Sequence, residues 1–593
     1  MKKIIGILFL FLGLVQFLSA QSIIQNPYGR QNAQSLNGKW DAIIDPFCRG
    51  EETKFYLLKT PQKKSDFVEY SFDNTLQLDV PGDFNSQLPE LKYYEGNIWY
   101  RHKINITKQN SNRKFIYFAG ANYLTTVWLN GVQIGKHEGG FTAFQFEISM
   151  QLKEGENNLV VLVNNNRKVD GIPAMNFDWW NYGGILRDVF LIETPTTYIS
   201  DYQIQLKKNT PDLIQGYVKL EGATITQTLE LAIPELKIKQ KLTTDENGLA
   251  VFEIKSKPVL WEPSNPKLYK VTVSTNADVV SDEIGFRTIE TKGRDILLNG
   301  KSIFLKGVNF HEEIPQRLGR AYSEADAVMI LSEVKALGCN FARTAHYPQN
   351  ERIVRLAEKM GIMLWEEIPL WQGIEFTNPV ILGKAKNMLQ DMICRDKNRA
   401  GIIIWSIANE TRPSEGRDKV LIDLVSKTHE LDNSRLVSAA FDNLSFDKDS
   451  LCFKLNDNLA KVVDIVGINK YLGWYTPFPT NPEKIKWNIE VNKPLIMSEF
   501  GGESLYGQHG SVDVAQSWSE EYQEEIYKNN LIAFKNIPNL RGTTPWVLFD
   551  FRSPRRLLPN FQDGWNRKGL VSDKGLRKKA WYIMKKYYEE VGK

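Results

Sequence analysis

The C-terminal half of the sequence alternates short apolar runs with helical patterns, and this alternation constrains the fold more than any other feature. Runs too apolar for surface strands occur at residues 302–309, 339–344, 361–366, 401–408, 435–440, 463–469, 494–499 and 543–549. Helical patterns lie between several of them, and one starts at Ser323, a good N-cap residue, with Asp326 three positions later. Eight strands that alternate with helices predict a (β/α)8 TIM barrel over residues 291–593.

Two β domains are predicted ahead of the barrel. At 593 residues the chain is too long for one core, since domains typically hold roughly 100 to 200 residues. Residues 21–194 contain short strand patterns broken by turns such as Asn130-Gly131, and residues 195–290 contain a second, smaller set. We therefore expect a jelly-roll-like β-sandwich, an immunoglobulin-like β-sandwich and then the barrel, which together make a multidomain β plus α/β protein.

Residues 1–20 have the pattern of a cleavable signal peptide. Lys2 and Lys3 precede an apolar stretch at residues 4–18, and the small residues Ser19 and Ala20 follow it. The stretch is shorter than the roughly 20 residues that a membrane-spanning helix needs. The pattern predicts cleavage before residue 21 and a periplasmic or secreted protein without a membrane anchor.

The charge of the chain is close to balanced. The formal net charge is +4, and it falls to +2 when the two lysines of the signal peptide are removed. This balance argues against nucleic acid or an anionic membrane as a partner, so an acidic ligand must be recognised by a local site. The four cysteines show neither paired spacing nor the neighbouring histidines of a zinc site. The sequence leaves the oligomeric state open and allows a homo-oligomer.

Two of the apolar runs lead directly into a glutamate. Glu410 follows the run at 401–408, and Glu499 ends the run at 494–499. The carboxyl ends of parallel barrel strands meet at one face, and two carboxyls about 5 Å apart are what a retaining glycosidase needs. Glu410 fits the acid/base and Glu499 the nucleophile. The alternative for either glutamate alone is a solvated or ion-paired loop residue.

Two neighbours of these glutamates fit supporting roles. Asn409, directly before Glu410, can hydrogen-bond the 2-hydroxyl of the sugar, a contact that strengthens in the transition state. Arg343 lies in the run at 339–344 and can keep Glu499 ionised by charge proximity. The sequence thus predicts four polar side chains at one face of the barrel.

Five segments resemble glycoside hydrolase family 2. They are WSIANE at 405–410, MSEFGG at 497–502, GVNFHE at 307–312, RTAHYP at 343–348 and DWWNYGGI at 178–185. The resemblance implies a sugar-binding jelly-roll domain, an immunoglobulin-like sandwich and a catalytic barrel, and it carries the acid/base role to Glu410 and the nucleophile role to Glu499. It also implies substrate contacts for Asp178, His311 and His346.

The choice of sugar depends on a second set of residues. Asn566 and Lys568 lie in an NRKG string that looks like the element by which β-glucuronidases bind the substrate carboxylate. The string NKYLGWY at 469–475 resembles the aromatic loop of the same enzymes, which would place Tyr471 beside the nucleophile and Tyr475 near the sugar. Trp546 would form a platform for the sugar, with ordinary barrel core as the alternative. The alternative interpretation of Lys568 is a surface lysine in a basic stretch.

The chain departs from the β-glucuronidase pattern at one position. Where those enzymes carry an arginine four positions before the asparagine of the NRKG string, this chain has Gln562. Arg552, Arg555 and Arg556 can replace that arginine or can bind sulfate or uronate at a neighbouring subsite. No essential metal or cofactor is expected, because the pair Glu366-Glu367 lacks the adjacent histidine of the metal-dependent galactosidases in the family.

These observations predict an exo-acting retaining β-glycosidase, with β-glucuronidase favoured. Its substrate would be an oligosaccharide with a terminal β-linked uronic acid, released from a polysaccharide. One alternative is a β-galactosidase of the same family that acts on a neutral or algal galactan. The other is a carbohydrate-binding protein with an inactive barrel, which the presence of both Glu410 and Glu499 argues against.

Overall fold

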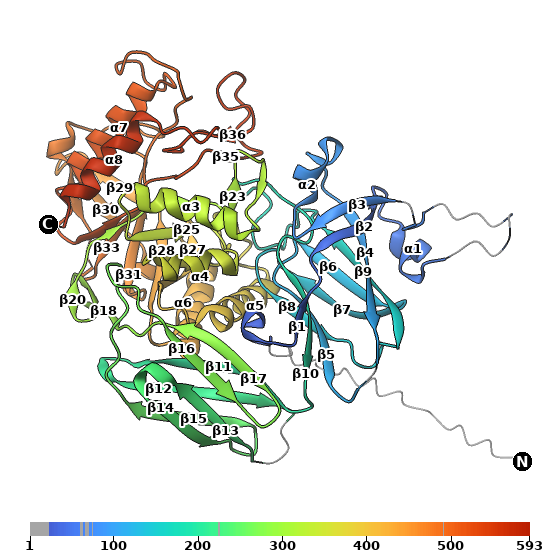
Figure 1. The fold of residues 1–593 in the computed structure, drawn as a ribbon. Helices are drawn as coiled ribbons and strands as arrows, with labels where there is room; N and C mark the ends of the chain where they lie inside the picture. The colour runs from blue at the N-terminus through green and yellow to red at the C-terminus, as the bar shows by residue number, and fades with distance from the viewer. Residues whose placement is uncertain are drawn as a thin grey trace, which may run out of the picture.

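The N-terminal residues form a sandwich of two antiparallel sheets, drawn in blue and cyan in Figure 1. The computed structural model describes residues 23–592 except 60–62, 64, 66–69, 74, 109, 223–225 and 490, so the predicted signal peptide lies outside the described residues. One sheet has the order β3-β2-β4-β9-β6-β7 and the other β1-β10-β5-β8. Alternate residues of facing strands, such as Tyr100 and Phe118, fill the core between them.

The bounds of these strands are as follows. The larger sheet contains β2 (Gly38–Asp45), β3 (Leu76–Val80), β4 (Asn97–Ile106), β6 (Leu124–Leu129), β7 (Val132–Glu138) and β9 (Gly155–Asn164). The smaller sheet contains β1 (Ala33–Ser35), β5 (Arg113–Phe118), β8 (Phe144–Glu147) and β10 (Val189–Thr194). Two short helices, α1 (Gly50–Thr53) and α2 (Phe84–Gln87), lie between strands of this domain.

A second, smaller sandwich follows, drawn in green at the bottom of Figure 1. Its three-stranded sheet contains β11 (Tyr198–Lys207), β12 (Thr210–Glu221) and β15 (Leu249–Lys255). Its four-stranded sheet contains β13 (Thr228–Ile233), β14 (Ile238–Thr243), β16 (Tyr269–Ser274) and β17 (Val279–Ile284). Antiparallel sheets of three and four strands are the arrangement of an immunoglobulin-like domain, which confirms that part of the fold prediction.

A parallel sheet that closes on itself forms the third domain. The order of its segments is β21-β34-β33-β31-β28-β27-β26-β25-β22. The two end segments, β21 and β22, belong to one stretch of chain, so this stretch pairs with β34 on one side and β25 on the other. The eight-stranded barrel is therefore confirmed. The segments are β21 (Leu305–Lys306), β22 (Asn309–Phe310), β25 (Phe341–Thr344), β26 (Met363–Glu367), β27 (Ile402–Asn409), β28 (Leu436–Phe441), β31 (Ile465–Asn469), β33 (Leu495–Glu499) and β34 (Leu540–Thr543).

Helices cover the outside of the barrel. They are α3 (Glu324–Ala336), α4 (Glu351–Lys359), α5 (Pro379–Asp396), α6 (Glu415–Leu431), α7 (Glu520–Phe534) and α8 (Lys579–Glu590). The predicted cap at Ser323 is confirmed, because its side chain accepts from the backbone of Asp326 and the Asp326 side chain accepts from the backbone of Ser323. No described helix is long and apolar enough to span a bilayer.

Two connections of the barrel differ from the regular pattern. Instead of an α-helix, the described residues after β28 and β31 contribute β29 (Leu444–Asp447), β30 (Cys452–Leu455) and β32 (Lys486–Asn488), which form a small sheet.

The last barrel strand, β34, ends earlier than the predicted run at 543–549. Its pairing with β33 stops at Thr543, shortly before Pro545, which has no N–H to donate to a ladder. Trp546 consequently lies beyond the strand, above the end of the barrel.

Three smaller sheets complete the barrel domain. β18 (Ile289–Lys292), β19 (Asp295–Leu298) and β20 (Lys301–Ser302) pack against the N-terminal ends of barrel strands, where Ile296 contacts the cluster that contains Phe341 and Ile404. At the opposite ends lie β23 (Glu313–Ile314) with β24 (Gly319–Arg320), and β35 (Phe551–Arg552) with β36 (Trp565–Asn566). The loops at these opposite ends surround the cavity described below.

A buried ion pair joins the first sandwich to the barrel. Arg187 precedes β10, and its guanidinium lies 2.7 Å from the carboxylate of Glu312, with both side chains 1% exposed. Arg187 also donates to the backbone oxygens of Phe141 and Pro348, at 2.8 and 2.6 Å. Removal of one partner of such a pair typically costs about 3–5 kcal/mol, because the other charge remains buried. The pair therefore fixes the loop at residues 165–188 against the barrel.

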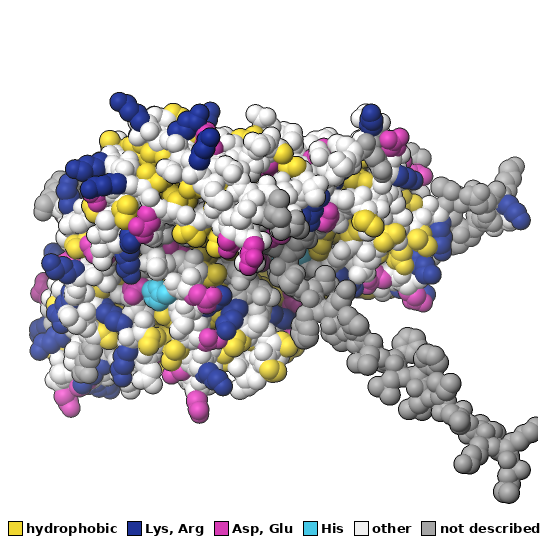
Figure 2. Space-filling view, turned by 90° about the horizontal axis from the view of Figure 1, so that it is seen from below, with side chains coloured by type: hydrophobic (Ala, Val, Ile, Leu, Met, Phe, Trp, Pro, Cys, Tyr) yellow, Lys and Arg dark blue, Asp and Glu magenta, His cyan; other side chains and the backbone are white. Residues whose placement is uncertain are grey.

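The surface carries charges of both signs. On the face that Figure 2 shows, Lys and Arg side chains are interspersed with Asp and Glu side chains and with small apolar areas. This distribution agrees with the modest net charge of +4. That face therefore has no extended region of purely positive or purely negative electrostatic potential.

Candidate active site

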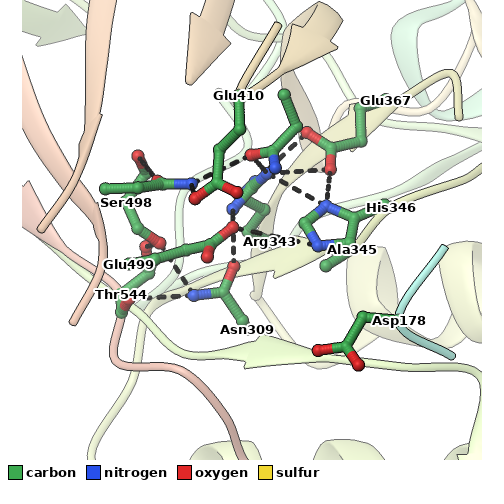
Figure 3. A network of polar contacts seen from close by, with 12 residues as sticks. Asp178, Asn309, Arg343, Ala345, His346, Glu367, Glu410, Ser498, Glu499 and Thr544 are labelled. Atoms are coloured by element: carbon green, nitrogen blue, oxygen red, sulfur yellow. Dashed lines mark hydrogen bonds and ion pairs between the residues drawn. The ribbon is translucent and has the colours of Figure 1, made fainter. Parts of the chain in front are cut away.

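Arg343 lies at the centre of a polar network at the C-terminal ends of the barrel strands (Figure 3). It belongs to β25 and is completely buried. The guanidinium donates to the carboxylate of Glu367, at 2.9 and 3.1 Å, and to that of Glu499, at 2.7 Å. It also donates to the amide oxygens of Asn409, at 2.7 Å, and Asn309, at 3.2 Å. The fork of donors fixes side chains from four strands relative to one another.

Glu499, the predicted nucleophile, is the last residue of β33 and is 3% exposed. One carboxylate oxygen accepts from Arg343, and the other accepts from the Tyr471 hydroxyl at 2.6 Å. The Nε2 atom of His346 lies 3.8 Å from the first oxygen. Each oxygen therefore has its own donor, so the carboxylate is held in one orientation.

Glu410, the predicted acid/base, directly follows the last residue of β27. The register of β27 against β28 shifts just before it, and its φ of 52° is in the left-handed region that glutamate rarely adopts. Asn469 donates to one carboxyl oxygen at 2.9 Å and Gln372 to the other at 2.8 Å. These features turn the side chain toward the space that Glu499 also faces (Figure 3).

The surroundings of Glu410 favour its protonated form. Burial first, then the negative charges of Glu499 and Asp442, raise the pKa of Glu410 to about 8. The hydrogen bonds from Asn469 and Gln372 act in the opposite direction, because they stabilise the carboxylate. A glutamate that is protonated near neutral pH beside a second carboxylate is suited to donate a proton.

Both glutamates line one cavity of about 400 Å³. Most of the other predicted site residues also line it, namely Asp178, His311, His346, Tyr471, Tyr475 and Trp546. Arg343, Asn409, Asn566 and Lys568 lie behind this lining rather than in it. Asp178 comes from the loop at 165–188, so the first sandwich contributes to the wall of a cavity whose glutamates belong to the barrel.

Two of the predicted sugar contacts keep an open polar atom. His311 bonds the Tyr347 hydroxyl through Nδ1 at 3.1 Å, whereas its buried Nε2 has no partner among the described residues. Burial, together with the charges of His346 and Arg320, lowers the pKa of His311 well below its usual range, so the ring is neutral. The Asn409 side-chain nitrogen is likewise buried and has no partner in the described part of the chain. Each of these two buried atoms has hydrogen-bonding capacity that no described residue uses.

Trp546 and His346 form an aromatic wall of the cavity. The two rings stack with centroids 4.8 Å apart and an angle of 19° between planes. His346 is held by Glu367, whose carboxylate lies 2.7 Å from Nδ1. Trp546 is only 5% exposed and belongs to a cluster of buried aromatic side chains, so it packs in the core and also faces the cavity.

Asn566 and Lys568 lie behind Asp178 and Tyr475. The Asn566 side-chain nitrogen donates to Asp178 at 3.3 Å. The Lys568 ammonium donates to Glu503 at 2.9 Å and to the Tyr475 hydroxyl at 2.8 Å. Lys568 is 1% exposed, which excludes the alternative interpretation of this residue as a surface lysine in a basic stretch.

Several residues of the site were not predicted. Glu367 and Asn469 are each the last residue of a barrel strand, as Glu499 is. A polar residue at the end of an apolar run was therefore a sequence pattern that could have identified both. Gln372 and Trp371 lie in the loop after β26, where no pattern marks them. Asp442 and Lys470 also line the cavity. In the part of the chain that the structure describes, no group of three or more His, Cys, Asp or Glu residues is arranged to hold a metal ion.

Family models match the chain over three consecutive segments. Residues 33–195 match the sugar binding domain of glycosyl hydrolases family 2, residues 197–287 match a second model of that family, and residues 289–592 match its TIM barrel domain. The chain belongs to glycosyl hydrolase family 2. The predicted resemblance and the predicted order of the three domains are therefore confirmed, and the protein is a glycoside hydrolase.

Individual family 2 proteins are similar over most of the chain. A putative beta-glucuronidase of Formosa agariphila is 29% identical over 84% of this chain, which spans 64% of the length of that relative. A beta-glucuronidase of Paenibacillus borealis is 25% identical, with 94% of this chain and 97% of the relative covered. The crystal structure of a beta-galacturonidase from Eisenbergiella tayi bound to galacturonate superposes with a TM-score of 0.79 at 24% identity, over 96% of this chain and 100% of that chain. This last likeness shows that the fold is shared.

Proposed function

We propose that this family 2 protein is an exo-acting retaining β-glucuronidase that removes uronic acid from the non-reducing end of polysaccharide-derived oligosaccharides. The observation that carries the proposal is the set of residues in and around the cavity. It holds Glu410 and Glu499 at the ends of two barrel strands, and the cations of Lys568 and Arg556 reach the Tyr475 hydroxyl in its wall. The similarity to proteins named β-glucuronidase supports the same activity.

In the first step, Glu499 attacks the anomeric carbon while Glu410 donates its proton to the departing oxygen. Arg343 and Tyr471 hold the attacking carboxylate in place. Formation of the ester removes the negative charge of Glu499, and the pKa of Glu410 then falls because that charge was one of the causes that raised it.

In the second step, Glu410 acts as a base. It takes a proton from water, which attacks the anomeric carbon and releases the sugar with its original configuration. The His311 ring, which lines the cavity and has an unpartnered Nε2, supplies a hydrogen bond to a sugar hydroxyl during both steps. The neutral ring of His311 can donate or accept at Nε2, depending on its tautomer.

A panel of aryl glycosides tests this proposal. We expect kcat/KM for an aryl β-glucuronide to exceed that for the aryl β-galactoside by roughly 100-fold or more, because buried polar groups that bind a carboxylate are left unpaired by a neutral sugar. Equal or faster hydrolysis of the galactoside would refute the proposal in favour of a β-galactosidase. An aryl β-galacturonide completes the panel, and equal turnover of it would leave uronic acids as the substrate class without a preference at carbon 4.

We also propose that the enzyme is exported to the periplasm or secreted. The support is the signal-peptide pattern at residues 1–20, which lies outside the described residues. We expect the mature protein to begin at residue 21 when the full chain is produced in an exporting bacterial host. N-terminal sequencing of the protein from periplasm and medium checks this, and an intact Met1 there would contradict it.

A further inference from the structure

Two charged side chains in the lining of the cavity make no hydrogen bond or ion pair with another described residue. They are Asp442, which is exposed, and Lys470, which is half-buried. The other charged side chains of the lining each bond a neighbour, namely Asp178, Glu410, Glu499, Arg555 and Arg556. Asp442 and Lys470 therefore keep hydrogen-bonding capacity toward the cavity.

Asp442 and Lys470 each follow directly after the end of a barrel strand. Asp442 follows β28 and Lys470 follows β31. The two strands are neighbours, and Phe441 pairs with Ile468 near their ends. The backbone N–H of Lys470 donates to the backbone oxygen of Glu499 at 2.8 Å. Because parallel strands end at the same face of the barrel, the carboxylate and the ammonium lie at one wall of the cavity.

The two side chains influence each other without forming an ion pair. The protein around Asp442 displaces water and raises its pKa, and the positive charge of Lys470 opposes this rise. Desolvation likewise lowers the pKa of Lys470, and the charge of Asp442 opposes it. The Lys470 ammonium lies 5.1 Å from the centroid of the Phe453 ring. A ring attracts the charge but offers no oxygen or nitrogen acceptor, so the N–H donors of Lys470 remain open.

Asp442 lies next to the acid/base. In the sheet, β27 runs between β26 and β28, so Glu410 is flanked by the loops that follow these two strands. Gln372, from the loop after β26, donates to Glu410 at 2.8 Å. Asp442, on the other side, affects Glu410 only through its charge. Since Glu410 must reach the departing oxygen, the group attached to that oxygen leaves past Asp442.

The sugar that is released by hydrolysis contacts a different arc of the barrel. Glu499, Trp546 and His311 lie at or beyond the ends of β33, β34 and β22, which are consecutive in the closed sheet. Asp442 and Lys470 lie on the arc of β28 and β31. The cavity therefore has one arc for the sugar that is attacked and a second arc that remains for the leaving group.

The chemistry of the second arc suits hydroxyl groups. A carboxylate only accepts hydrogen bonds and an ammonium only donates them, whereas a sugar hydroxyl does both. Two hydroxyls of one sugar ring can therefore satisfy Asp442 and Lys470 together. A leaving group without hydroxyls offers a partner to neither side chain.

We propose that Asp442 and Lys470 bind the leaving sugar, with one of its hydroxyls donating to Asp442 and another accepting from Lys470. This contact makes the enzyme selective for a hydroxylated leaving group. The inference rests on the proposed function, because it takes Glu410 as the proton donor to the departing oxygen. The alternative is a solvated pair of charges at the cavity mouth, which would not affect the choice of leaving group.

The test compares two leaving groups that both need a proton. One is glucose, in a set of β-glucuronosyl-glucose disaccharides that differ in linkage, and the other is cyclohexanol, in cyclohexyl β-glucuronide. Both leave as poor alkoxides, so a change in the pKa of Glu410 affects them alike, whereas only glucose carries further hydroxyls. Release of glucuronic acid gives kcat/KM on the acidic plateau of each variant, for the disaccharide that the wild-type enzyme hydrolyses fastest and for the cyclohexyl glucuronide.

Asp442→Ala and Lys470→Met should each lower the ratio of kcat/KM for the disaccharide to that for the cyclohexyl glucuronide by roughly 10- to 100-fold, since each removes a charged hydrogen bond. The matched controls are Asp449→Ala and Lys448→Met, which change an exposed acid and an exposed lysine in the turn between β29 and β30. They should leave the ratio within about 2-fold of the wild-type value. Thermal unfolding curves show whether each variant remains folded.

Equal losses on both substrates would overturn the proposal, because that is the effect expected when Asp442 and Lys470 act only through the charge of Glu410. Hydrolysis of cyclohexyl β-glucuronide without hydrolysis of any of the disaccharides would also overturn it. Failure of the proposed function is visible separately. If the wild-type protein hydrolyses no glucuronide, the same ratio is measured with galactosyl-glucose disaccharides and cyclohexyl β-galactoside. A selective loss there would support the leaving-sugar site although the released sugar differs, and hydrolysis of neither set would overturn both proposals.

Discussion

Replacement of Glu499 by alanine is expected to lower kcat for an aryl β-glucuronide by roughly 10⁴-fold or more, because the double displacement loses its nucleophile. Stability should change little. Arg343 keeps its two hydrogen bonds to Glu367 when Glu499 is removed, so its buried charge remains paired. Steady-state kinetics of the purified variant, with its thermal unfolding curve, measure both quantities.

The control for this variant is Glu483→Ala, which removes an exposed glutamate elsewhere in the barrel domain. It should leave kcat within about 2-fold of the wild-type value. Hydrolysis by Glu499→Ala at the wild-type rate would contradict the assignment of the nucleophile. Absence of hydrolysis in the wild-type protein, with binding of sugars retained, would instead support a carbohydrate-binding protein with an inactive barrel.

The barrel and its two catalytic candidates could be predicted because buried parallel strands leave a strong pattern. A strand covered on both faces is apolar along its whole length, so a carboxyl at its end is conspicuous. Glu410 and Glu499 were predicted in this way, and the same rule applied to every run would also have marked Glu367 and Asn469, which end β26 and β31.

The remaining parts of the site could not be predicted because they depend on loops that meet only in the folded chain. Arg556 is one of three nearby arginines, and nothing in the sequence shows that it faces Asp178, which lies 378 positions away. Gln372 similarly reaches Glu410 from a loop without periodicity. The last strand was predicted at 543–549, whereas its pairing with β33 ends at Thr543. The prediction was too late in the sequence because an apolar stretch does not show where the hydrogen bonds between two strands end.

Replacement of Glu410 by alanine is expected to lower kcat/KM by roughly 10²- to 10⁴-fold for a glucuronide with a poor leaving group, the usual range for loss of a general acid. With 2,4-dinitrophenol as the leaving group, the loss in the first step should be much smaller, since that oxygen departs without protonation. The pH profile should change as well. In the proposed mechanism the wild-type enzyme needs protonated Glu410, so its kcat/KM should fall as the pH rises through about 8, the pKa to which burial and the charges of Glu499 and Asp442 raise this group. That alkaline limb should be absent in Glu410→Ala.

Asp442→Asn provides the matched control for the pH profile. The substitution removes a negative charge that raises the pKa of Glu410, so the alkaline limb should move to lower pH while Glu410 itself is retained. A structural role for Glu410 predicts a different outcome, in which Glu410→Ala loses the same factor on every leaving group and keeps its alkaline limb. Gln372 and Asn469 each donate to Glu410, so both lose their acceptor in Glu410→Ala. The effect of this loss on kcat/KM is the same for every substrate. A dependence on leaving-group acidity therefore reports proton donation and not the loss of these hydrogen bonds.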